Sequence, residues 1–336
     1  MFAAPGYRAK DFMKPRIAVL GCGYWGSNHI RTLKSLGVLA AVSDANAARA
    51  EGFASEHDCI AIAPEDLFDH PDIDALVLAL PPQFHAEYAM RAMRAGKDVL
   101  VEKPIALTVA DAEKAVAVAR EEKRIIMVGH VLRFHPAFEK LKALIDQGDL
   151  GEVRYIHSHR LGLGKFHTEN DALWDLAPHD LSMILAITGA SPVEVRGEGA
   201  ALLDHLSDFA HVHMRFPGGL RSHLFISRLN PYRERRLTVV GDKAMAVFDD
   251  VEPWPRKLAV YRHAVWQDSG HWAFTANEPA YVQVEEGMPL TRELEHFIHC
   301  IETREAPRTT GEEAIEVLRI LTAGSVVHGG RVNQPS

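Results

Sequence analysis

The chain has 336 residues, enough for two domains that each build a hydrophobic core. Of these residues 47% are hydrophobic and 24% are charged, which is typical of a folded globular protein. The formal net charge is −8, from 45 acidic and 37 basic residues, and no run of lysine or arginine is present, which argues against a nucleic-acid partner.

The cysteines indicate a reducing compartment. The chain has only 3 of them, Cys22, Cys59 and Cys300, too few and too scattered for a disulfide framework or a CxxC metal site. No apolar stretch approaches the roughly 18 to 20 residues that cross a bilayer, and the first residues lack the apolar segment of a signal peptide. We therefore expect a cytoplasmic protein with no membrane partner, and we interpret residues 1–12 as a loosely held tail.

The N-terminal half alternates short apolar runs with helical periodicity. Unbroken runs of this kind are typical of strands buried on both faces of a parallel sheet. They cover residues 16–21, 38–44, 74–80, 98–103 and 125–130. A helix is predicted to follow Thr108, which forms an N-terminal cap pair with Asp111. The alternation predicts an α/β domain of the Rossmann type, with a doubly wound parallel sheet, over residues 13–133.

After about residue 150 the pattern changes to strand-like segments joined by short turns. They cover residues 152–162, 193–202, 208–216, 220–229, 235–242, 244–250 and 257–263. These segments predict a large, mostly antiparallel sheet. Two helices are predicted to close the chain, one over about residues 290–301 and one after a capping box formed by Thr310 and Glu313. Residues 134–336 are therefore predicted to form an α+β domain.

The 19 histidines raise the question of a bound metal. None lies in an HExxH motif. The pairs His157 and His159, and His211 and His213, alternate with a period of two, as side chains on one face of a strand do. We expect no metal site.

The turn after the first predicted strand carries the glycine pattern Gly21-x-Gly23-x-x-Gly26. Such glycines let a pyrophosphate approach the amide groups at the N-terminus of the next helix. The second strand ends at Asp44, whose carboxylate can accept the ribose hydroxyls of NAD and would repel the extra phosphate of NADP. We interpret this region as an NAD site. The alternatives are a plain packed turn, a helix-capping role for Asp44, and tolerance of NADP through Arg49.

Several features together resemble the GFO/IDH/MocA oxidoreductase family, in which a Rossmann domain precedes a sheet-rich substrate domain. They are the glycine pattern, PPQFHAE at residues 81–87, EKP at residues 102–104 and DLAPHD at residues 175–180. The resemblance implies an NAD(P)-dependent dehydrogenase that acts on CH–OH groups. It places further cofactor contacts at Tyr24, Trp25, Leu80, Pro81, His85, Glu102 and Lys103.

Lys103 lies at the carboxyl end of a predicted parallel strand, where ligands bind in open α/β sheets. By resemblance it is the active-site lysine, and the family often has a cis peptide bond before the following proline. An ammonium group there would hydrogen-bond the reacting oxygen and stabilise its alkoxide character. The alternative is a solvated surface lysine.

Asp175 and His179 share a face if their segment is helical. Pro178 is harmless only in a first helical turn, so we expect a helix that begins near residues 176–177 with His179 close to its N-terminus. The helix dipole would then favour neutral imidazole, the form that a general base requires. By resemblance His179 is that base and Asp175 orients it. A buried structural histidine is the alternative, and Asp180 is expected to be structural.

Within the family, the segments GCGYWGSNHIR and LWDLAPHDLSMI most resemble the branch that oxidises carbon 3 of UDP-linked N-acetylhexosamines, with UDP-N-acetylglucosamine favoured. The resulting 3-keto sugar is aminated later, in amino-sugar, glycolipid or lipopolysaccharide biosynthesis. A UDP-sugar needs cations in the site, despite the acidic chain. Candidate substrate contacts are Arg133, Arg160, Lys165, Trp174, Asp175 and His179, and His135, Arg228 and Arg233 lie in segments that could also reach the substrate.

Other functions stay open at this point. They are a free-sugar or inositol-type polyol dehydrogenase, a keto-sugar reductase, and a noncatalytic NAD-binding sensor. The resemblance also implies that an apolar open face of the C-terminal sheet meets another subunit, which favours a homodimer or homotetramer.

Overall fold

The computed structural model describes residues 14–164 and 171–325. The predicted tail and the candidate Lys165 lie outside the described residues. The chain divides into two compact units. One, here called the N-terminal unit, reaches to Glu102 and also includes Lys114–Met127 and Leu294–Arg308. The other, the sheet unit, comprises Lys103–Glu113, Val128–Glu293 and the chain from Thr309 on.

The N-terminal unit is built on a 6-stranded sheet with the strand order β3-β2-β1-β4-β5-β6. The strands are β1 Ile17–Leu20, β2 Leu39–Ser43, β3 Ile60–Ala61, β4 Ala75–Leu78, β5 Asp98–Glu102 and β6 Ile126–Gly129. Pairing from β3 through β5 is parallel, and every residue of β1, β4 and β5 is buried, as expected for strands covered on both faces. The predicted Rossmann sheet is confirmed. Only β3, too short for a periodic signal, was missing from the prediction.

All but the last of the following helices connect these strands, and the last lies near the other end of the chain. They are α1 Tyr24–Leu36, α2 Ala47–His57, α3 Pro64–Leu67, α4 His85–Arg94 with the short 3-10 turn η1 Pro82–Phe84 before it, α5 Val109–Glu121 and α8 Pro289–Thr303. The predicted cap of α5 forms, because Thr108 Oγ1 accepts a hydrogen bond from the amide of Asp111 at 3.1 Å. The helix periodicity and the cap signal therefore located α5 correctly.

The segment Leu294–Arg308 belongs to the N-terminal unit although it lies near the other end of the chain. Its Arg304 donates from Nη1 and Nη2 to the two carboxylate oxygens of Asp98, at 2.6 and 2.9 Å. Asp98 is buried and also accepts from the amide of Ile125 at 2.8 Å. A two-point arginine contact of this kind is among the stronger ion pairs in proteins. The unit is therefore discontinuous in sequence.

The sheet unit contains an 8-stranded sheet with the order β16-β13-β12-β11-β7-β10-β9-β8. The strands are β7 Val153–Leu163, β8 Glu194–Ala200, β9 Phe209–Arg215, β10 Arg221–Ser227, β11 Leu229–Gly241, β12 Met245–Asp249, β13 Leu258–Tyr261 and β16 Ala280–Tyr281. All neighbours are antiparallel except β7 and β10, so the prediction of a mostly antiparallel sheet is confirmed. β11 begins earlier than its apolar run indicated.

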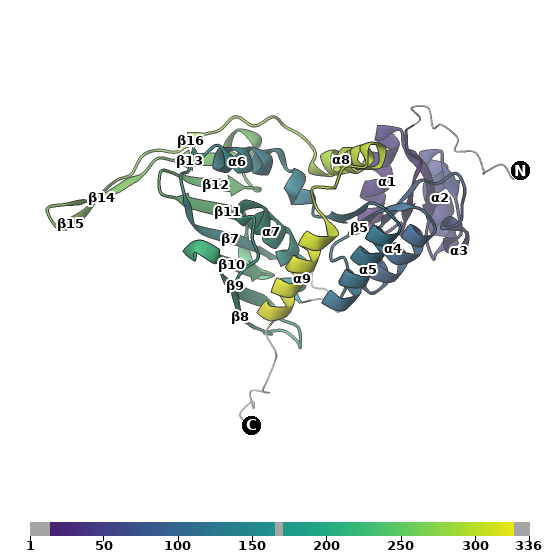
Figure 1. Cartoon of the computed structure of the whole chain (residues 1–336), viewed down its shortest axis with the longest axis horizontal. Helices are drawn as coiled ribbons and strands as arrows, with labels where there is room; N and C mark the ends of the chain where they lie inside the picture. Colours follow the sequence, from purple (N-terminus) through teal and green to yellow (C-terminus); the bar gives the residue numbers. More distant parts are fainter. Residues whose placement is uncertain (1–13, 165–170, 326–336) are drawn as a thin grey trace, which may run out of the picture. The chain divides into compact units, whose positions relative to one another are not determined.

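One face of this sheet is covered by helices. They are α6 Pro136–Asp146, α7 Ala172–Thr188 and α9 Gly311–Gly324, and the short 3-10 turns of the unit are η2 Val131–Phe134, η3 Pro217–Gly219 and η4 Trp254–Arg256. Figure 1 shows α7 and α9 lying against the sheet. The approach is close, since a Cβ on Gly197 of β8 would lie 1.9 Å from the carbonyl oxygen of Gly324 in α9. This helix-covered face holds the core of the unit and the side chains discussed below.

The opposite face carries histidines on β7, β9 and β10, with Tyr155 and Phe225 among them, so it is less apolar than we expected. His157, His213 and His223 stand in register on neighbouring strands, and the rings of His213 and His223 stack with centroids 4.6 Å apart. Burial lowers the pKa of His157, and it lowers that of His223 to about 4. The predicted period-two placement of the histidine pairs is confirmed. Within the described ranges, no group of three or more His, Cys, Asp or Glu side chains is arranged to hold a metal ion.

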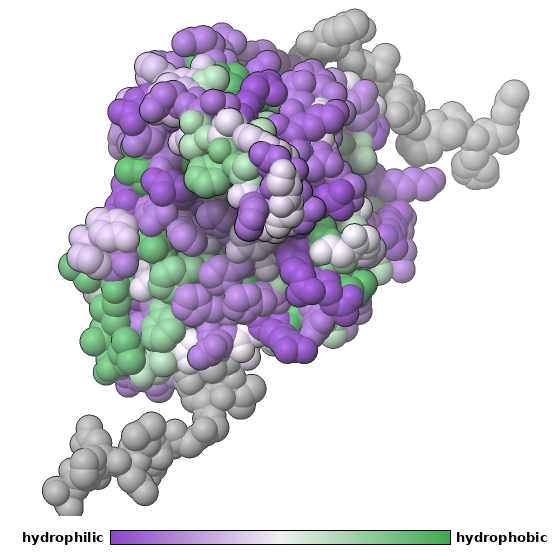
Figure 2. All heavy atoms as spheres, turned by 90° about the vertical axis from the view of Figure 1, so that its left-hand side faces the viewer, coloured by the Kyte–Doolittle hydropathy of each residue, from purple (hydrophilic) through white to green (hydrophobic). Residues whose placement is uncertain are grey.

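A two-stranded hairpin, β14 Ala264–Asp268 and β15 His271–Thr275, projects from the sheet unit (Figure 1). The sequence pattern did not predict it. Its Trp272 and Phe274 are 73% and 72% exposed. Figure 2, viewed from the side toward which the hairpin extends, shows patches of hydrophobic surface among a mostly hydrophilic one. An isolated two-stranded hairpin is marginally stable in water, so these strands gain little from their own pairing.

Candidate active site

The glycine-rich turn joins β1 to α1 in the N-terminal unit. Gly21 has a φ of +100°, and a Cβ there would lie 2.3 Å from the carbonyl oxygen of Ala79. A Cβ on Gly26 would lie 1.8 Å from the carbonyl oxygen of Gly21. Gly23 precedes α1 and brings no side-chain acceptor to the helix N-terminus, so an anion can take that place. The turn fits a pyrophosphate group.

Asp44 lies directly after β2, against this turn. Its Oδ2 accepts from the amide of Cys22 at 2.7 Å, and its Oδ1 accepts from the amide of Asn46 at 2.8 Å. Burial and the Asp44 charge raise the pKa of the Cys22 thiol to about 12. Helix α2 is capped by Asn46, whose side chain accepts from the amide of Arg49, so Asp44 is not the cap of that helix. Arg49 Nη1 lies 3.4 Å from Asp44 Oδ2.

Two further segments of the unit follow the ends of β4 and β5. His85 Nε2 donates to the carbonyl of Leu80 at 2.7 Å, which fixes the residues around Pro81. Glu102, the last residue of β5, pairs with His29 of α1, with Nε2 and Oε1 2.7 Å apart and both side chains buried. Sequence reasoning overlooked His29, although its place one turn after Gly26 on the inner face of α1 was a usable signal. The two aromatic residues of the turn, Tyr24 and Trp25, are both exposed.

Lys103 belongs to the sheet unit and contacts α7. The peptide bond between Lys103 and Pro104 is cis, as the resemblance implied. Lys103 Nζ donates to the backbone carbonyl of Asp175 at 2.7 Å and lies 3.4 Å from Asp175 Oδ1. Its side chain is only 14% exposed, so Lys103 is not a solvated surface lysine.

Helix α7 begins earlier than Pro178 indicated. It starts at Ala172, because the side chain of Asp171 accepts from the amide of Trp174 at 2.8 Å and caps the helix there. Pro178 therefore lies inside the helix, and the prediction of a start near residues 176–177 is wrong. His179 is consequently too far from the N-terminus for the helix dipole to act on it strongly.

His179 is nevertheless neutral, for a different reason. Burial lowers its pKa well below the ordinary value, and the charges of Lys103 and Arg160 lower it further. Its Nδ1 is buried and has no hydrogen-bond partner within the described residues. Asp175, which we expected to orient this ring, contacts Lys103 in the structure. The arrangement leaves a neutral imidazole near an ammonium group, as base chemistry on a hydroxyl requires.

His130 is a third basic side chain of this group, and sequence reasoning missed it. It is 1% exposed, and neither ring nitrogen has a hydrogen-bond partner within the described residues. Burial and the charges of Arg133 and Lys103 lower its pKa to about 3. Its place directly after β6, where ligands bind in open parallel sheets, was the signal that could have found it. We call Lys103, His130, Asp175 and His179 the lysine–histidine cluster.

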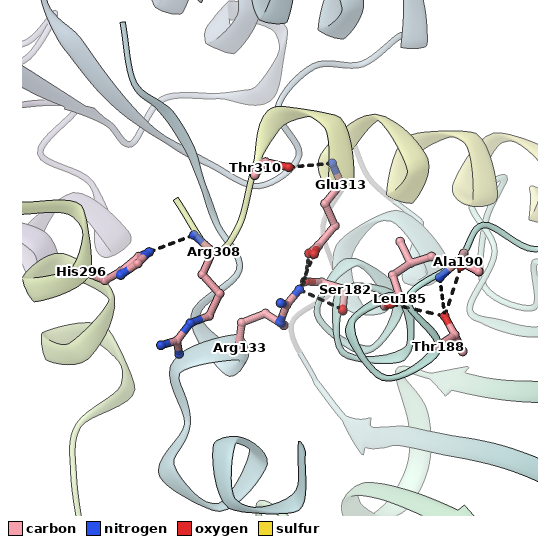
Figure 3. Close-up of polar contacts among 9 residues, drawn as sticks. All are labelled: Arg133, Ser182, Leu185, Thr188, Ala190, His296, Arg308, Thr310 and Glu313. Atoms are coloured by element: carbon pink, nitrogen blue, oxygen red, sulfur yellow. Dashed lines mark hydrogen bonds and ion pairs between the residues drawn. The ribbon is translucent and has the colours of Figure 1, made fainter. Parts of the chain in front are cut away.

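Arg133 is held inside the sheet unit. Its Nη1 donates to the carboxylate of Glu313 and, at 3.3 Å, to Ser182 Oγ, which itself donates to Glu313 Oε1 at 2.6 Å (Figure 3). Thr310 Oγ1 accepts from the Glu313 amide at 3.1 Å, as the predicted capping box requires. The Glu313 carboxylate serves Arg133 and Ser182, so the box also ties η2, α7 and α9 together.

Arg160 and Asp180 form a buried ion pair on the helix-covered face of the sheet. Arg160 donates from Nε to Asp180 Oδ2, and its Nη2 lies 3.3 Å from Oδ1. Ser158 Oγ donates to Asp180 Oδ1 at 2.6 Å. Each charge is therefore paired, as buried charges generally are.

The remaining candidates also have partners or lie at the surface. Trp174 Nε1 donates to Ser325 Oγ at 3.0 Å, His135 Nδ1 accepts from the amide of Ala137 at 3.1 Å, Arg228 Nε donates to Asp208 Oδ1 at 2.7 Å, and Arg233 is exposed. The structure thus brings Lys103, Asp175 and His179 together. It gives Arg133, Arg160 and Arg228 carboxylate partners of their own.

Several cations act on His179. Besides Lys103 and Arg160, the charge of Arg235 lowers its pKa. The pKa of Arg235 is itself lowered by burial and by repulsion from Arg160 and Arg233. The carboxylate of Asp250 lies 3.5 Å from Arg235 and 3.8 Å from Lys257, so two cations share one anion. Such a site favours a ligand that brings negative charge.

A pyrophosphate turn with an acidic residue after β2, and a lysine beside a neutral imidazole, are the parts of a nicotinamide-dependent dehydrogenase. Comparison with known families agrees. Residues 15–130 match the profile described as "Oxidoreductase family, NAD-binding Rossmann fold", and residues 138–247 match "GFO/IDH/MocA C-terminal domain". The chain belongs to the GFO/IDH/MocA oxidoreductase family and uses NAD(P).

Two kinds of named relatives stand out. The chain is 33% identical over 235 residues to the UDP-N-acetylglucosamine 3-dehydrogenase of Acidithiobacillus ferrooxidans, covering 70% of this chain and 74% of the relative. A solved structure of that enzyme superposes with a TM-score of 0.81 at 29% identity, covering 92% of this chain and 96% of the other. The inositol 2-dehydrogenase of Rhizobium meliloti is 26% identical over 325 residues, 93% of this chain and 96% of the relative. The enzyme class, a dehydrogenase of CH–OH groups, is therefore established.

Proposed function

We propose that the chain is an NAD-dependent dehydrogenase that oxidises the carbon-3 hydroxyl of a UDP-linked N-acetylhexosamine, with UDP-N-acetylglucosamine favoured. The product is a 3-keto sugar that an aminotransferase can convert to a 3-amino sugar for polysaccharide or lipopolysaccharide biosynthesis. The observation that carries this choice is the group of cations whose charges act on His179, namely Lys103, Arg160 and Arg235. A UDP-sugar brings two phosphate charges, whereas a free polyol brings none.

The residues of the lysine–histidine cluster divide the reaction among them. His179 Nε2 takes the proton of the hydroxyl, since its ring is neutral over the physiological pH range. Lys103 Nζ donates a hydrogen bond to the same oxygen as the carbonyl forms, and the carbonyl of Asp175 holds Lys103 in place. NAD, when bound, accepts the hydride from the carbon. His130 offers one N–H and one lone pair to a neighbouring polar group of the sugar, because its buried ring nitrogens have no other partner within the described residues.

NAD is favoured over NADP. Two backbone amides fix the Asp44 carboxylate beside the glycine turn, where it can accept the ribose hydroxyls and would repel a phosphate. Arg49, which could have bound that phosphate, contacts Asp44 instead. The rate with NAD should therefore exceed the rate with NADP at equal concentration.

The histidine-bearing face of the large sheet is our proposed surface for a homodimer or homotetramer. Burial lowers the pKa of His157, His211 and His223 on this face, which reduces the positive charge that would oppose a second copy. Sedimentation at two protein concentrations measures the assembly. Within residues 14–164 and 171–325, no helix is both long and apolar enough to span a bilayer. The cysteines Cys22, Cys59 and Cys300 are all free, which fits a reducing cytoplasm.

The deciding experiment offers NAD together with one sugar at a time and follows NADH absorbance. UDP-N-acetylglucosamine should support turnover, and N-acetylglucosamine without the UDP group should not, since it lacks the charges that the cations attract. Turnover of myo-inositol in preference to the UDP-sugar would overturn the proposal. It would favour the polyol alternative, which the nearly full-length similarity to inositol 2-dehydrogenase supports.

A further inference from the structure

Pro178 occupies an unusual position. It lies in the second turn of α7, where a proline removes one backbone hydrogen bond and crowds the preceding turn. The helix nevertheless runs from Ala172 to Thr188. A residue that disfavours its own helix often has a local function. The residues one turn before Pro178 indicate what that function is.

The proline changes the backbone of the turn that contains Asp175. Pro178 has no amide hydrogen, so the carbonyl of Trp174, four residues back, has no amide donor in the helix. A proline ring in a helix interior also crowds the carbonyl four residues back, and prolines are a common origin of kinks in helices. The carbonyl of Asp175 is the next one along the same turn.

Lys103 contacts this turn. Its Nζ lies 2.7 Å from the carbonyl oxygen of Asp175, but 3.4 Å from the carboxylate oxygen Oδ1. A helical carbonyl has two lone pairs, and the second becomes accessible when the turn is opened. Of these two contacts with Asp175, the one with the backbone carbonyl is the shorter.

We propose that Pro178 is a positioning residue that opens α7 so that the backbone carbonyl of Asp175 can hold the ammonium group of Lys103. This inference rests on the proposed function, because it assumes that Lys103 acts on the substrate oxygen. Pro178 itself touches no reacting atom. Its effect passes through the Asp175 carbonyl to Lys103.

The test is Pro178→Ala, which restores an amide hydrogen at that position. Because alanine suits a helix interior far better than proline, the variant should unfold at a higher temperature than the parent chain. Its kcat should nevertheless fall about ten- to hundredfold, since displacement of a catalytic group by about 1 Å costs that much. The KM for NAD should stay unchanged. A purely structural proline would not lower kcat while raising the unfolding temperature.

The matched control is Pro136→Ala. Pro136 is the first residue of α6, where the missing amide hydrogen is harmless, so this variant should change neither kcat nor the unfolding temperature appreciably. A crystal structure of the Pro178→Ala chain supplies a readout that needs no substrate. The distance between Lys103 Nζ and the Asp175 carbonyl should exceed 3.5 Å. An unchanged distance would overturn the inference.

Combination with Lys103→Ala separates this inference from the proposed function. If Pro178 acts through Lys103, Pro178→Ala should have no further effect on kcat in the Lys103→Ala background. An equal loss in both backgrounds would contradict the inference, and so would a normal kcat in Pro178→Ala. If Lys103→Ala itself kept the parent rate, the proposed role of Lys103 would fail instead.

Discussion

The candidate site residues of the two units differ in the partners of their buried polar groups. In the N-terminal unit the two carboxylates near the glycine turn have protein partners: two backbone amides bind Asp44, and His29 Nε2 pairs with Glu102. In the sheet unit, both ring nitrogens of His130 and Nδ1 of His179 have no partner within the described residues. A buried polar group without a partner is costly unless a ligand supplies one. We infer from this difference that a ligand supplies the missing partners of the lysine–histidine cluster.

The largest effect should come from removing the reacting groups of the sheet unit. Lys103→Ala and His179→Ala should each lower kcat about a thousandfold, because each removes a proton-transfer or oxygen-stabilising group. The Kd for NAD, measured by titration calorimetry, should stay within about threefold of the parent value, since the N-terminal unit is untouched. If either variant kept a kcat near that of the parent chain, the residue removed would not be a reacting group of the sheet unit.

The reverse experiment alters the N-terminal unit alone. Gly26→Ala places a Cβ 1.8 Å from the Gly21 carbonyl, so it should lower both the unfolding temperature and the affinity for NAD, the latter by about a hundredfold. Gly23→Ala meets nothing within 4 Å in the protein, so it should keep the unfolding temperature and lose NAD affinity because of a clash with the pyrophosphate. Gly52→Ala in α2, which also meets nothing, is the control. Equal NAD affinity in all of them would contradict a pyrophosphate site at this turn.

The variant His130→Phe should have a smaller effect on the reaction, and it tests whether a ligand contacts the His130 ring. The phenyl ring fills the same space without polar atoms, so the substrate should lose one or two hydrogen bonds and its KM should rise about tenfold. The unfolding temperature should rise, since no unpartnered nitrogens stay buried. His213→Phe, an exposed change on the other face of the sheet, should leave KM unchanged. An unchanged KM in His130→Phe would mean that no ligand completes this ring.

The smallest effect near neutral pH concerns stability. Burial lowers the pKa of His130 to about 3, whereas in the unfolded chain it is about 6.5. Below pH 6.5, His130 therefore binds a proton in the unfolded state but not in the folded state. Between that pH and the folded pKa, this residue lowers the free energy of unfolding by about 1.4 kcal/mol for each pH unit that the pH falls. Urea titrations at pH 7, 6 and 5 should show a shallower fall for His130→Phe than for the parent chain. Parallel curves would be inconsistent with a buried, neutral His130.

The parts of the molecule that depend on local sequence were predicted well. The apolar runs located the strands of the Rossmann sheet, and Thr108 and Thr310 marked two helix starts through contacts only a few residues long. The glycine turn and Asp44 could be proposed because a pyrophosphate site requires particular residues at a short and regular spacing in the sequence. Lys103 and His179 were proposed as site residues through motifs of the family, not through their contacts.

Long-range contacts account for what the sequence did not predict. Pro178 pointed to a late start of α7, but the cap at Asp171 begins the helix earlier and the proline is tolerated inside it. His130 is notable because its ring nitrogens have no hydrogen-bond partner within the described residues. The spacing of residues in the sequence does not indicate this. The hairpin β14–β15 has no buried face to impose alternation on its sequence.

The ion pair between Arg304 and Asp98 has a consequence for how the chain is made. The two residues are 206 positions apart. During synthesis the ribosome must therefore translate most of the remaining chain before Arg304 can pair with Asp98. A buried carboxylate without its partner is strongly unfavourable. A fragment that stops at residue 133 would carry that unpaired charge, and co-translational folding of the N-terminal unit should stay incomplete until the segment Leu294–Arg308 has left the exit tunnel. The N-terminal unit, whose synthesis begins first, is thus among the last parts of the protein to finish folding.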